Sequence, residues 1–241
     1  LMEKFSWSYQ NTYLLFGCLA LIFTLLLALA FKHFPEKTPQ TKKLIVRKRY
    51  WLFYALTFFS GARRQIFVVF AGFLMVEKFH YSVAQISALF LLNYAFNWLF
   101  AAKIGKIIGK VGEANVLKFE YIGLIIIFIA YGWVENANIA AALYVIDHLF
   151  FALAIAIKTY FQKIALPEDI ASSAGVSFSI NHIAAVVIPA LLGMLWIINS
   201  SWVFYIGAGF AVCSLGLSML IPKNPAIGVE LRSHENELNP Q

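Results

Sequence analysis

Charged residues are scarce in this chain, since they make up 13% of its 241 residues whereas hydrophobic types make up 61%. A soluble domain is roughly a quarter charged and about half apolar, so the composition excludes a soluble enzyme and a disordered tail. Cysteine is nearly absent: Cys18 and Cys213 each lie in an apolar run without a Cys or His at ligand spacing, so the sequence indicates neither a disulfide framework nor a zinc site. No Gly-rich loop ending in Gly-Lys-Ser/Thr occurs, so no ATP machinery and no cofactor are expected.

Long hydrophobic runs are what the chain has in abundance. Seven stretches reach the length of about 18 apolar residues that a membrane-spanning helix needs. Runs such as 21–31 and 121–131 are apolar on every side, so the alternation typical of a membrane β-barrel is missing. The sequence therefore predicts an all-α polytopic membrane bundle of seven transmembrane helices. The predicted spans are residues 13–31, 51–76, 83–102, 116–134, 139–161, 173–198 and 202–221.

Basic residues gather in alternate connections between the predicted spans. The connection 32–49 holds seven of the 19 lysines and arginines, and the positive-inside rule places it in the cytoplasm. The N-terminus of the chain is then outside and the C-terminus cytoplasmic, in what we expect to be a bacterial inner membrane. A cleaved signal peptide is disfavoured because its basic residues would precede the first apolar run. The net charge of +7 is thus a topology signal rather than a sign of nucleic-acid binding, and the lipid bilayer is the expected partner.

Three local features resemble a known family. The connection from Gly105 to Glu113 is similar to a Gly-rich cytoplasmic motif, with Gly109 in place of the usual Asp and Glu113 in place of a usual basic residue. The motif positions expected to form this cytoplasmic gating loop are Gly105, Lys106, Lys110 and Gly112. The sixth span carries a second set of small and helix-bending residues, namely Pro167, Ala174, Gly175, Asn181, Pro189 and Gly193. One long cytoplasmic connection followed by short turns is the third feature. On these features the chain resembles the major facilitator superfamily.

That resemblance implies twelve helices in two six-helix halves, with these seven spans corresponding to the sixth to twelfth. Residues 1–31 would hold the last helix of the first half, 32–49 a basic linker, 50–222 the second half and 223–241 a short solvated cytoplasmic tail. The solute site of such a fold lies between the halves. Because the chain begins with Leu1 rather than Met, we expect a longer transporter to supply the missing half, with a partner membrane chain as the alternative.

Polar residues inside the spans are candidates for function, because an ionisable group at the centre of a bilayer costs about 2.5 to 3.5 kcal/mol. Arg63 and Arg64 lie too deep in the second span to reach water, whereas Lys158 is interpreted as an anchor that reaches the cytoplasmic surface. The other candidates are Asn93, Asn97, Asp147, His148, Asn181 and His182.

The charges of this set suggest a solute. Glu120 is placed near the end of its span, so two guanidiniums face one deep carboxylate, Asp147, and the half-site is net positive. We hypothesise that one arginine pairs with Asp147. The other would present donors, together with Asn93, Asn97, Asn181 and His182, to a small anionic or zwitterionic solute. Adjacent helical residues point about 100° apart, so one arginine could instead be a structural lock. Asp147 and His148 are candidates either for proton coupling or for a permanent salt bridge.

Four classes of function are compared on these residues. The leading one is a secondary transporter that works by alternating access, and the alternative is a non-transporting scaffold or subunit of a larger membrane complex. A haem subunit with His148 and His182 as ligands is disfavoured because the other histidines lie in loops or the tail. A membrane enzyme is disfavoured because no nucleophile, metal cluster or paired acids are recognisable, so the chain is not expected to be an enzyme.

Overall fold

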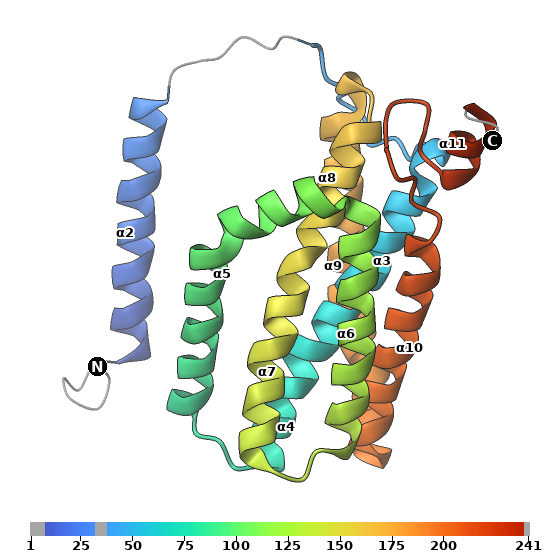
Figure 1. Ribbon diagram of the computed structural model, residues 1–241. Coiled ribbons are helices and arrows are strands. Elements are labelled where there is room, and N and C mark those ends of the chain that lie inside the picture. The colour runs from blue at the N-terminus through green and yellow to red at the C-terminus, as the bar shows by residue number, and fades with distance from the viewer. Residues whose placement is uncertain (1–7, 32–37, 239–241) are drawn as a thin grey trace. The chain divides into compact units, whose positions relative to one another are not determined.

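The computed structural model describes residues 8–31 and 38–238, which are helical almost throughout (Figure 1). Contacts divide the chain into two units, Leu1–Pro39 and Gln40–Gln241. The first unit holds one apolar helix, α2 (Tyr9–Ala30), which begins where the Ser8 hydroxyl accepts a hydrogen bond from the backbone N–H of Asn11 at 3.2 Å.

The second unit is a bundle of six long helical segments. Its elements are η1 (Lys48–Tyr50), α3 (Trp51–Gln65), η2 (Ile66–Ala71), α4 (Gly72–Glu77), α5 (Val83–Val111), α6 (Glu113–Trp133), α7 (Ala137–Phe151), η3 (Ala152–Ala154), α8 (Ile155–Ile164), η4 (Pro167–Asp169), α9 (Ile170–Ile198), α10 (Ser200–Ser218) and α11 (Arg232–Leu238). Within the described ranges, seven helical segments are long and apolar enough to cross a membrane, α2 among them. The predicted all-α, seven-helix membrane bundle is confirmed.

The third span differs most from its prediction. The apolar pattern ends near residue 102, but α5 continues to Val111 and changes direction on the way to α6 (Figure 1). Gly105, Lys106 and Lys110 are therefore helical, and the predicted gating loop is wrong for these three positions. Of the four motif residues Gly112 alone lies in the turn, where φ of +85° favours a residue without a Cβ. Three lysines keep these last turns polar, which is why hydropathy places the end of the helix too early.

The second span is irregular at one point. Between α3 and α4 the backbone forms a six-residue π-helix, η2, which begins directly after Gln65. The wider turn changes which side chains share a face, and such π segments are frequent at functional sites. Arg63 and Arg64 occupy the last turn of α3 before this change.

Helix α6 packs against α10, and α3 packs against α9. Two glycines let neighbouring helices approach closely. A Cβ at Gly207 on α10 would lie 2.8 Å from the ring of Phe128 on α6, and a Cβ at Gly123 on α6 would lie 2.2 Å from the ring of Phe150 on α7. Aromatic rings fill the space between the helices, including the stacked pair of Tyr131 and Phe204 with centroids 5.1 Å apart.

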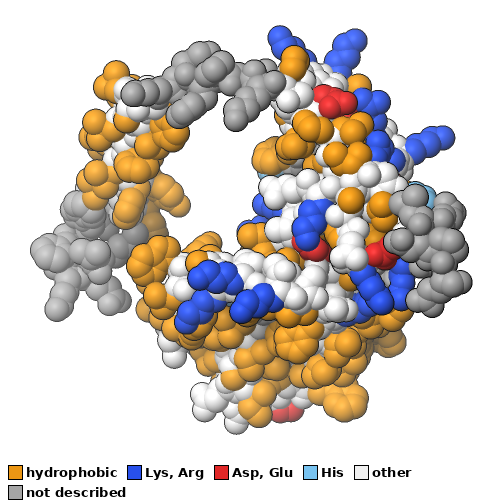
Figure 2. Space-filling model, turned by 45° about the horizontal axis from the view of Figure 1, so that its top comes forward, with side chains coloured by type: hydrophobic (Ala, Val, Ile, Leu, Met, Phe, Trp, Pro, Cys, Tyr) orange, Lys and Arg blue, Asp and Glu red, His pale blue; other side chains and the backbone are white. Residues whose placement is uncertain are grey.

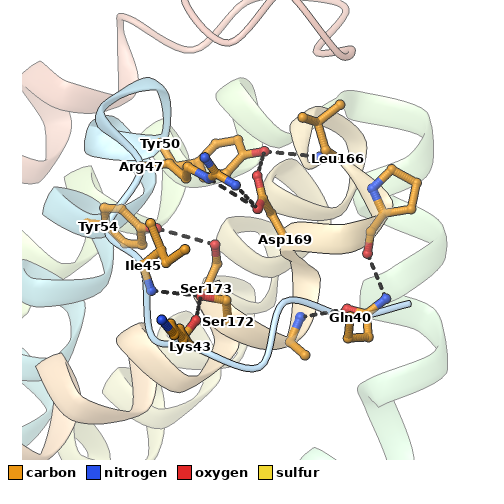
Figure 3. Close-up of polar contacts among 12 residues, drawn as sticks. Gln40, Lys43, Ile45, Arg47, Tyr50, Tyr54, Leu166, Asp169, Ser172 and Ser173 are labelled. Atoms are coloured by element: carbon orange, nitrogen blue, oxygen red, sulfur yellow. Dashed lines mark hydrogen bonds and ion pairs between the residues drawn. The ribbon is translucent and has the colours of Figure 1, made fainter. Parts of the chain in front are cut away.

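The N-terminal part of the second unit is fixed to the first turns of α9 (Figure 3). Asp169 accepts hydrogen bonds from Arg47 Nε at 3.1 Å and Nη2 at 2.9 Å, and from the Tyr50 hydroxyl at 3.2 Å. Ser172 Oγ accepts from the backbone N–H of Ile45 at 2.9 Å and donates to the carbonyl of Lys43 at 2.8 Å. The basic connection is thus ordered from Gln40 onward by specific partners.

The chain after α10 folds back onto the same end of the bundle. Glu230 is 5% exposed and forms an ion pair with Arg49, while its carbonyl accepts a hydrogen bond from the Tyr160 hydroxyl. Glu235 accepts hydrogen bonds from the backbone N–H groups of Lys223 at 2.8 Å and Asn224 at 3.1 Å. Residues 223–235 are thus held in place by a buried carboxylate and a short helix, while Lys223, Asn224 and Arg232 stay exposed, as expected of a solvated tail. We call this end of the unit, where lysines and arginines gather, the basic end (Figure 2).

Candidate functional site

A cavity of about 340 Å³ lies between α3, the α7–α8 segment and α9. Aromatic and aliphatic side chains form much of its wall, and a few polar groups converge on it, as in small-molecule sites. Its lining residues are Phe53, Thr57, Ser60, Gly61, Arg64, Phe151, Ala154, Ile155, Ile157, Lys158, Ser177 and Asn181. We call it the central cavity.

Arg64 is the cation that projects into the central cavity from α3. Its guanidinium carbon lies 5.9 Å from the ring centroid of Phe151, a distance at which the ring face attracts a cation. Arg64 is exposed and forms no ion pair within the described part of the chain. Its planar donor fork is therefore available to a ligand in the cavity.

Asn181 and His182 lie opposite Arg64, on α9. A second cavity, of about 150 Å³, is lined by Gly61, Arg64, Gln65, Asn181, His182 and Ala185. A Cβ at Gly61 would lie 2.5 Å from Asn181 Oδ1, so the glycine lets this amide approach α3. Asn181 Nδ2 donates to the carbonyl of Ser177 at 3.0 Å, and His182 Nδ1 lies 2.8 Å from the carbonyl of Phe178. The structure thus brings together Arg64, Asn181 and His182 from the predicted set.

Lys158 has a different place from the one its sequence position suggests. It is exposed and lines the central cavity beside Arg64, a place that its interpretation as a surface anchor did not include. The residue lies on α8, after the 3-10 turn η3 that separates α7 from α8. The wall of the cavity therefore carries two cations, one from each side.

Arg63 points the other way, into the interior of the bundle, where it is 1% exposed. Its guanidinium carbon lies 4.5 Å from the ring centroid of Tyr121, and its Nε donates to the carbonyl of Phe59 at 3.2 Å. Its Nη2 lies 3.8 Å from Glu120 Oε1, which is an ion pair too long for a hydrogen bond. Among the described residues no ion pair joins an arginine to Asp147, the expected partner, whereas Arg63 pairs with Glu120.

Glu120 was missed by sequence reasoning because the apolar pattern places it near the end of its span. Helix α6 begins at Glu113, so Glu120 lies two turns inside, roughly 10 Å from the first residue at the helical rise. It is 0% exposed, and neither carboxylate oxygen has a hydrogen-bond partner. The long side chain of Arg63 reaches from α3 to Glu120 on α6. A comparison of the depths of the two residues within their spans could have predicted this pair.

Asp147, on which the charge of Arg63 also acts, belongs to this buried cluster, and Asn93 is a further buried polar residue, on α5. Each is 1% exposed, and the polar atoms of both side chains lack hydrogen-bond partners. Helices α5 and α7 pack together through the edge-on rings of Phe90 and Tyr144 and through Asn97 Nδ2, which lies 2.8 Å from His148 Nε2. The predicted solute ligands Asn93 and Asn97 thus lie between α5 and α7, and neither lines the two cavities that hold Arg64.

The charge balance differs from the expected one. Inside the bundle, Arg63 faces two acids, Glu120 and Asp147, so the buried cluster carries one positive and two acidic groups. At the central cavity, Arg64 and Lys158 supply two positive charges without a described acidic partner. Of the two groups of interior charges, the one at the central cavity is therefore the net positive one, and the buried cluster is separate from it.

A comparison with protein-family models decides the family. The model of the Major Facilitator Superfamily matches residues 3–189, which is more than half of the chain. The chain belongs to the major facilitator superfamily. It is accordingly a membrane transporter, and members of this family are transporters rather than enzymes. No curated protein matches the chain.

Proposed function

We propose that this superfamily member moves a small anionic or zwitterionic solute by alternating access, with the central cavity as its half of the solute site. The observation that supports this is Arg64, an arginine that lines the cavity together with Lys158 and has no described acidic partner. A guanidinium binds a carboxylate or phosphate through two parallel hydrogen bonds. Asn181 and His182 supply further polar groups on the facing helix.

The other half of the site would come from outside the second unit. Solute sites of secondary transporters lie at the interface of two repeats, near the middle of the bilayer. We propose that the missing half belongs to the same protein, with a partner membrane chain as the alternative. The scaffold alternative is not favoured, because an idle scaffold gains nothing from cations kept unpaired in a cavity.

The basic end defines the proposed orientation. Lysines and arginines gather at this end of the second unit, which the positive-inside rule assigns to the cytoplasm (Figure 2). We propose a bacterial inner membrane with the C-terminus inside. Proteolysis after Lys223 or Arg232 in sealed vesicles tests this: cleavage is expected in inside-out vesicles, and cleavage in right-side-out vesicles alone would reverse the orientation.

Proton coupling is the proposed role of the buried cluster. One guanidinium cannot neutralise two ionised carboxylates, and a net charge in the bilayer interior is costly. One of Glu120 and Asp147 would therefore carry a proton, which it exchanges when the bundle rearranges. Both acids and Arg63, whose charge acts on both, are buried, so exchange of the proton with solvent requires such a rearrangement.

The experiment for solute recognition uses Arg64→Gln and Arg64→Lys in the protein reconstituted in vesicles. With labelled anionic solutes, Arg64→Gln should lower uptake by roughly 10- to 100-fold, the loss expected for a charge-assisted hydrogen bond. Uptake by Arg64→Lys should lie between that of the wild type and that of Arg64→Gln, because lysine keeps the positive charge but lacks the planar pair of donors. Lys103→Gln is the matched control, since Lys103 does not line the cavity. Wild-type uptake of every anionic solute by folded Arg64→Gln would refute the assignment.

The experiment for coupling separates driven uptake from exchange. Glu120→Gln and Asp147→Asn remove one acid each with little change of shape. At least one of them should abolish accumulation driven by a pH gradient and leave solute exchange without a gradient intact. If both variants retain gradient-driven accumulation, the cluster has a structural role and transport is not coupled through it.

A further inference from the structure

A separate cavity, of about 400 Å³, lies at the basic end and shares no lining residue with the central cavity. It is bounded by the last turn of α5, the first residues of α6, the end of α8 and the segment after α10. Its lining residues are Gly109, Lys110, Val111, Gly112, Glu113, Lys163, Lys223, Asn224 and Pro225. We call it the basic cavity. The proposed solute site does not involve it.

Three ammonium groups from three elements surround the basic cavity. Lys163 Nζ forms an ion pair at 2.7 Å with Glu113 Oε1, and Glu113 is 2% exposed. Lys110 and Lys223 are exposed and form no ion pair within the described ranges. The lining side chains therefore carry a net charge of about +2, and their mutual repulsion is relieved when an anion enters.

The backbone adds donors to the same wall. Gly112, at the N-terminal cap of α6, has no side chain to accept hydrogen bonds, so the first N–H groups of this long helix lack a side-chain acceptor. The uncapped N-terminus of a helix carries a partial positive charge and binds phosphate groups readily. The Glu113 carboxylate does not fill this role, because its Oε1 is held by Lys163 and its Oε2 has no hydrogen-bond partner.

The folded-back tail completes the cavity. Glu235 on α11 accepts hydrogen bonds from the backbone N–H groups of Lys223 and Asn224, which holds this segment in place. The Arg49–Glu230 ion pair attaches the tail to the N-terminal end of α3. The third lysine is thus positioned by specific contacts rather than left on a free chain.

We propose that the basic cavity binds the phosphate group of a glycerophosphate ester, held by Lys110, Lys163 and Lys223 at the N-terminus of α6. The volume accommodates a phosphate with a glycerol group. Two sources share this chemistry: the headgroup of an anionic phospholipid, and a soluble phosphate ester. Basic pockets between transmembrane helices at the cytoplasmic surface bind anionic headgroups by such charges.

The test measures the thermal unfolding midpoint of the purified protein in an uncharged detergent at low ionic strength. Short-chain phosphatidylglycerol, phosphatidylcholine of the same chain length and glycerol 3-phosphate are titrated separately. The double variant Lys110→Gln/Lys223→Gln removes the two unpaired charges and keeps the Lys163–Glu113 pair. The matched control Lys103→Gln/Lys106→Gln makes the same change of charge on α5, at exposed positions that do not line the cavity.

Phosphatidylglycerol should stabilise the wild type at lower concentration than phosphatidylcholine. The half-effective concentration should rise roughly fivefold for each lysine removed, so about 25-fold in the double variant, and stay near the wild-type value in the control. An equivalent effect of glycerol 3-phosphate supports the soluble source, and its absence supports the lipid. Equal responses of the site and control variants, or no stabilisation of the wild type by either anion, overturn the proposal. The single variant Lys223→Gln provides the same comparison if the double variant does not fold.

Discussion

Arg63 and Arg64 are adjacent in the sequence, yet their guanidiniums lie in different environments. Arg63 is 1% exposed and lies 3.8 Å from Glu120 inside the bundle, whereas Arg64 is exposed in the central cavity. Consecutive residues of a helix point about 100° apart, so one residue step separates a buried ion pair from the proposed solute site. A movement of α3 that alters one arginine must also alter the other, which gives the proposed coupling a direct structural route.

The two arginines should differ in their effect on stability. Arg63→Leu leaves Glu120 buried without its partner, and breaking a buried pair in this way costs about 3–5 kcal/mol. Arg64→Leu, at an exposed position, should cost less than about 1 kcal/mol. Unfolding in mixed detergent micelles measures both. The double variant Arg63→Leu/Glu120→Leu should recover most of the loss, and equal stability of the two single variants would argue against the buried pair.

Gly123 should be intolerant of a side chain. A Cβ there would lie 2.2 Å from the ring of Phe150, so Gly123→Ala forces the ring or the helix to move and should destabilise the protein by about 1–3 kcal/mol. Gly72→Ala is the matched control, because a Cβ at Gly72 meets nothing within 4 Å. That change should be neutral or stabilise by up to about 1 kcal/mol, since alanine is the better helix former. The same loss for both variants would show that α6 does not pack as described.

Asp169 should be needed to hold the connection that precedes α3. Its carboxylate accepts three hydrogen bonds, from Arg47 and Tyr50, and its side chain is 2% exposed. Asp169→Ala should cost about 2–4 kcal/mol and speed hydrogen exchange at the Ile45 amide. Glu168→Ala, which removes the neighbouring acid, is the control and should leave both measurements near wild type. Unchanged exchange in Asp169→Ala would mean that other contacts hold the connection.

The tail should lose its attachment in acid. Burial acts to raise the pKa of Glu230, but hydrogen bonds from Arg49 and from the Gly228 N–H outweigh it, and the pKa lies below the ordinary 4.5. A carboxyl whose pKa is lowered by folding contributes its full stability above the unfolded value and loses it as pH falls through the folded one. The contribution of Glu230 is therefore complete above about pH 4.5 and vanishes below the lowered pKa.

The unfolding midpoint of Glu230→Gln measures this dependence. It should lie below that of the wild type at pH 7, and the difference should shrink to nothing in acid, because the protonated wild type resembles the amide. Glu135→Gln is the control: its side chain is 81% exposed beside Lys78, and an exposed pair contributes about 0–1 kcal/mol at most. A difference for Glu230→Gln that stays constant with pH would contradict the ion pair.

Hydropathy predicted the helices well because each one must present an apolar surface to lipid over the part that crosses the bilayer. The positions of the polar residues within their spans were less predictable. Lys158 and Glu120 were both assigned to span ends, and the structure places one in a cavity and the other in the interior. A single span gives the depth of a residue only roughly, since helices extend past their apolar part, as α5 does.

The sequence by itself determined the membrane-spanning class, the seven helical segments and the presence of interior charge, because each follows from local composition and from the cost of placing polar groups in lipid. Tertiary structure decided which charge met which partner. The Arg63–Glu120 pair, the cavity of Arg64 and Lys158, and the attachment of Glu230 to Arg49 all join residues from different elements. Such contacts depend on helix rotation and packing, which no single stretch of sequence encodes.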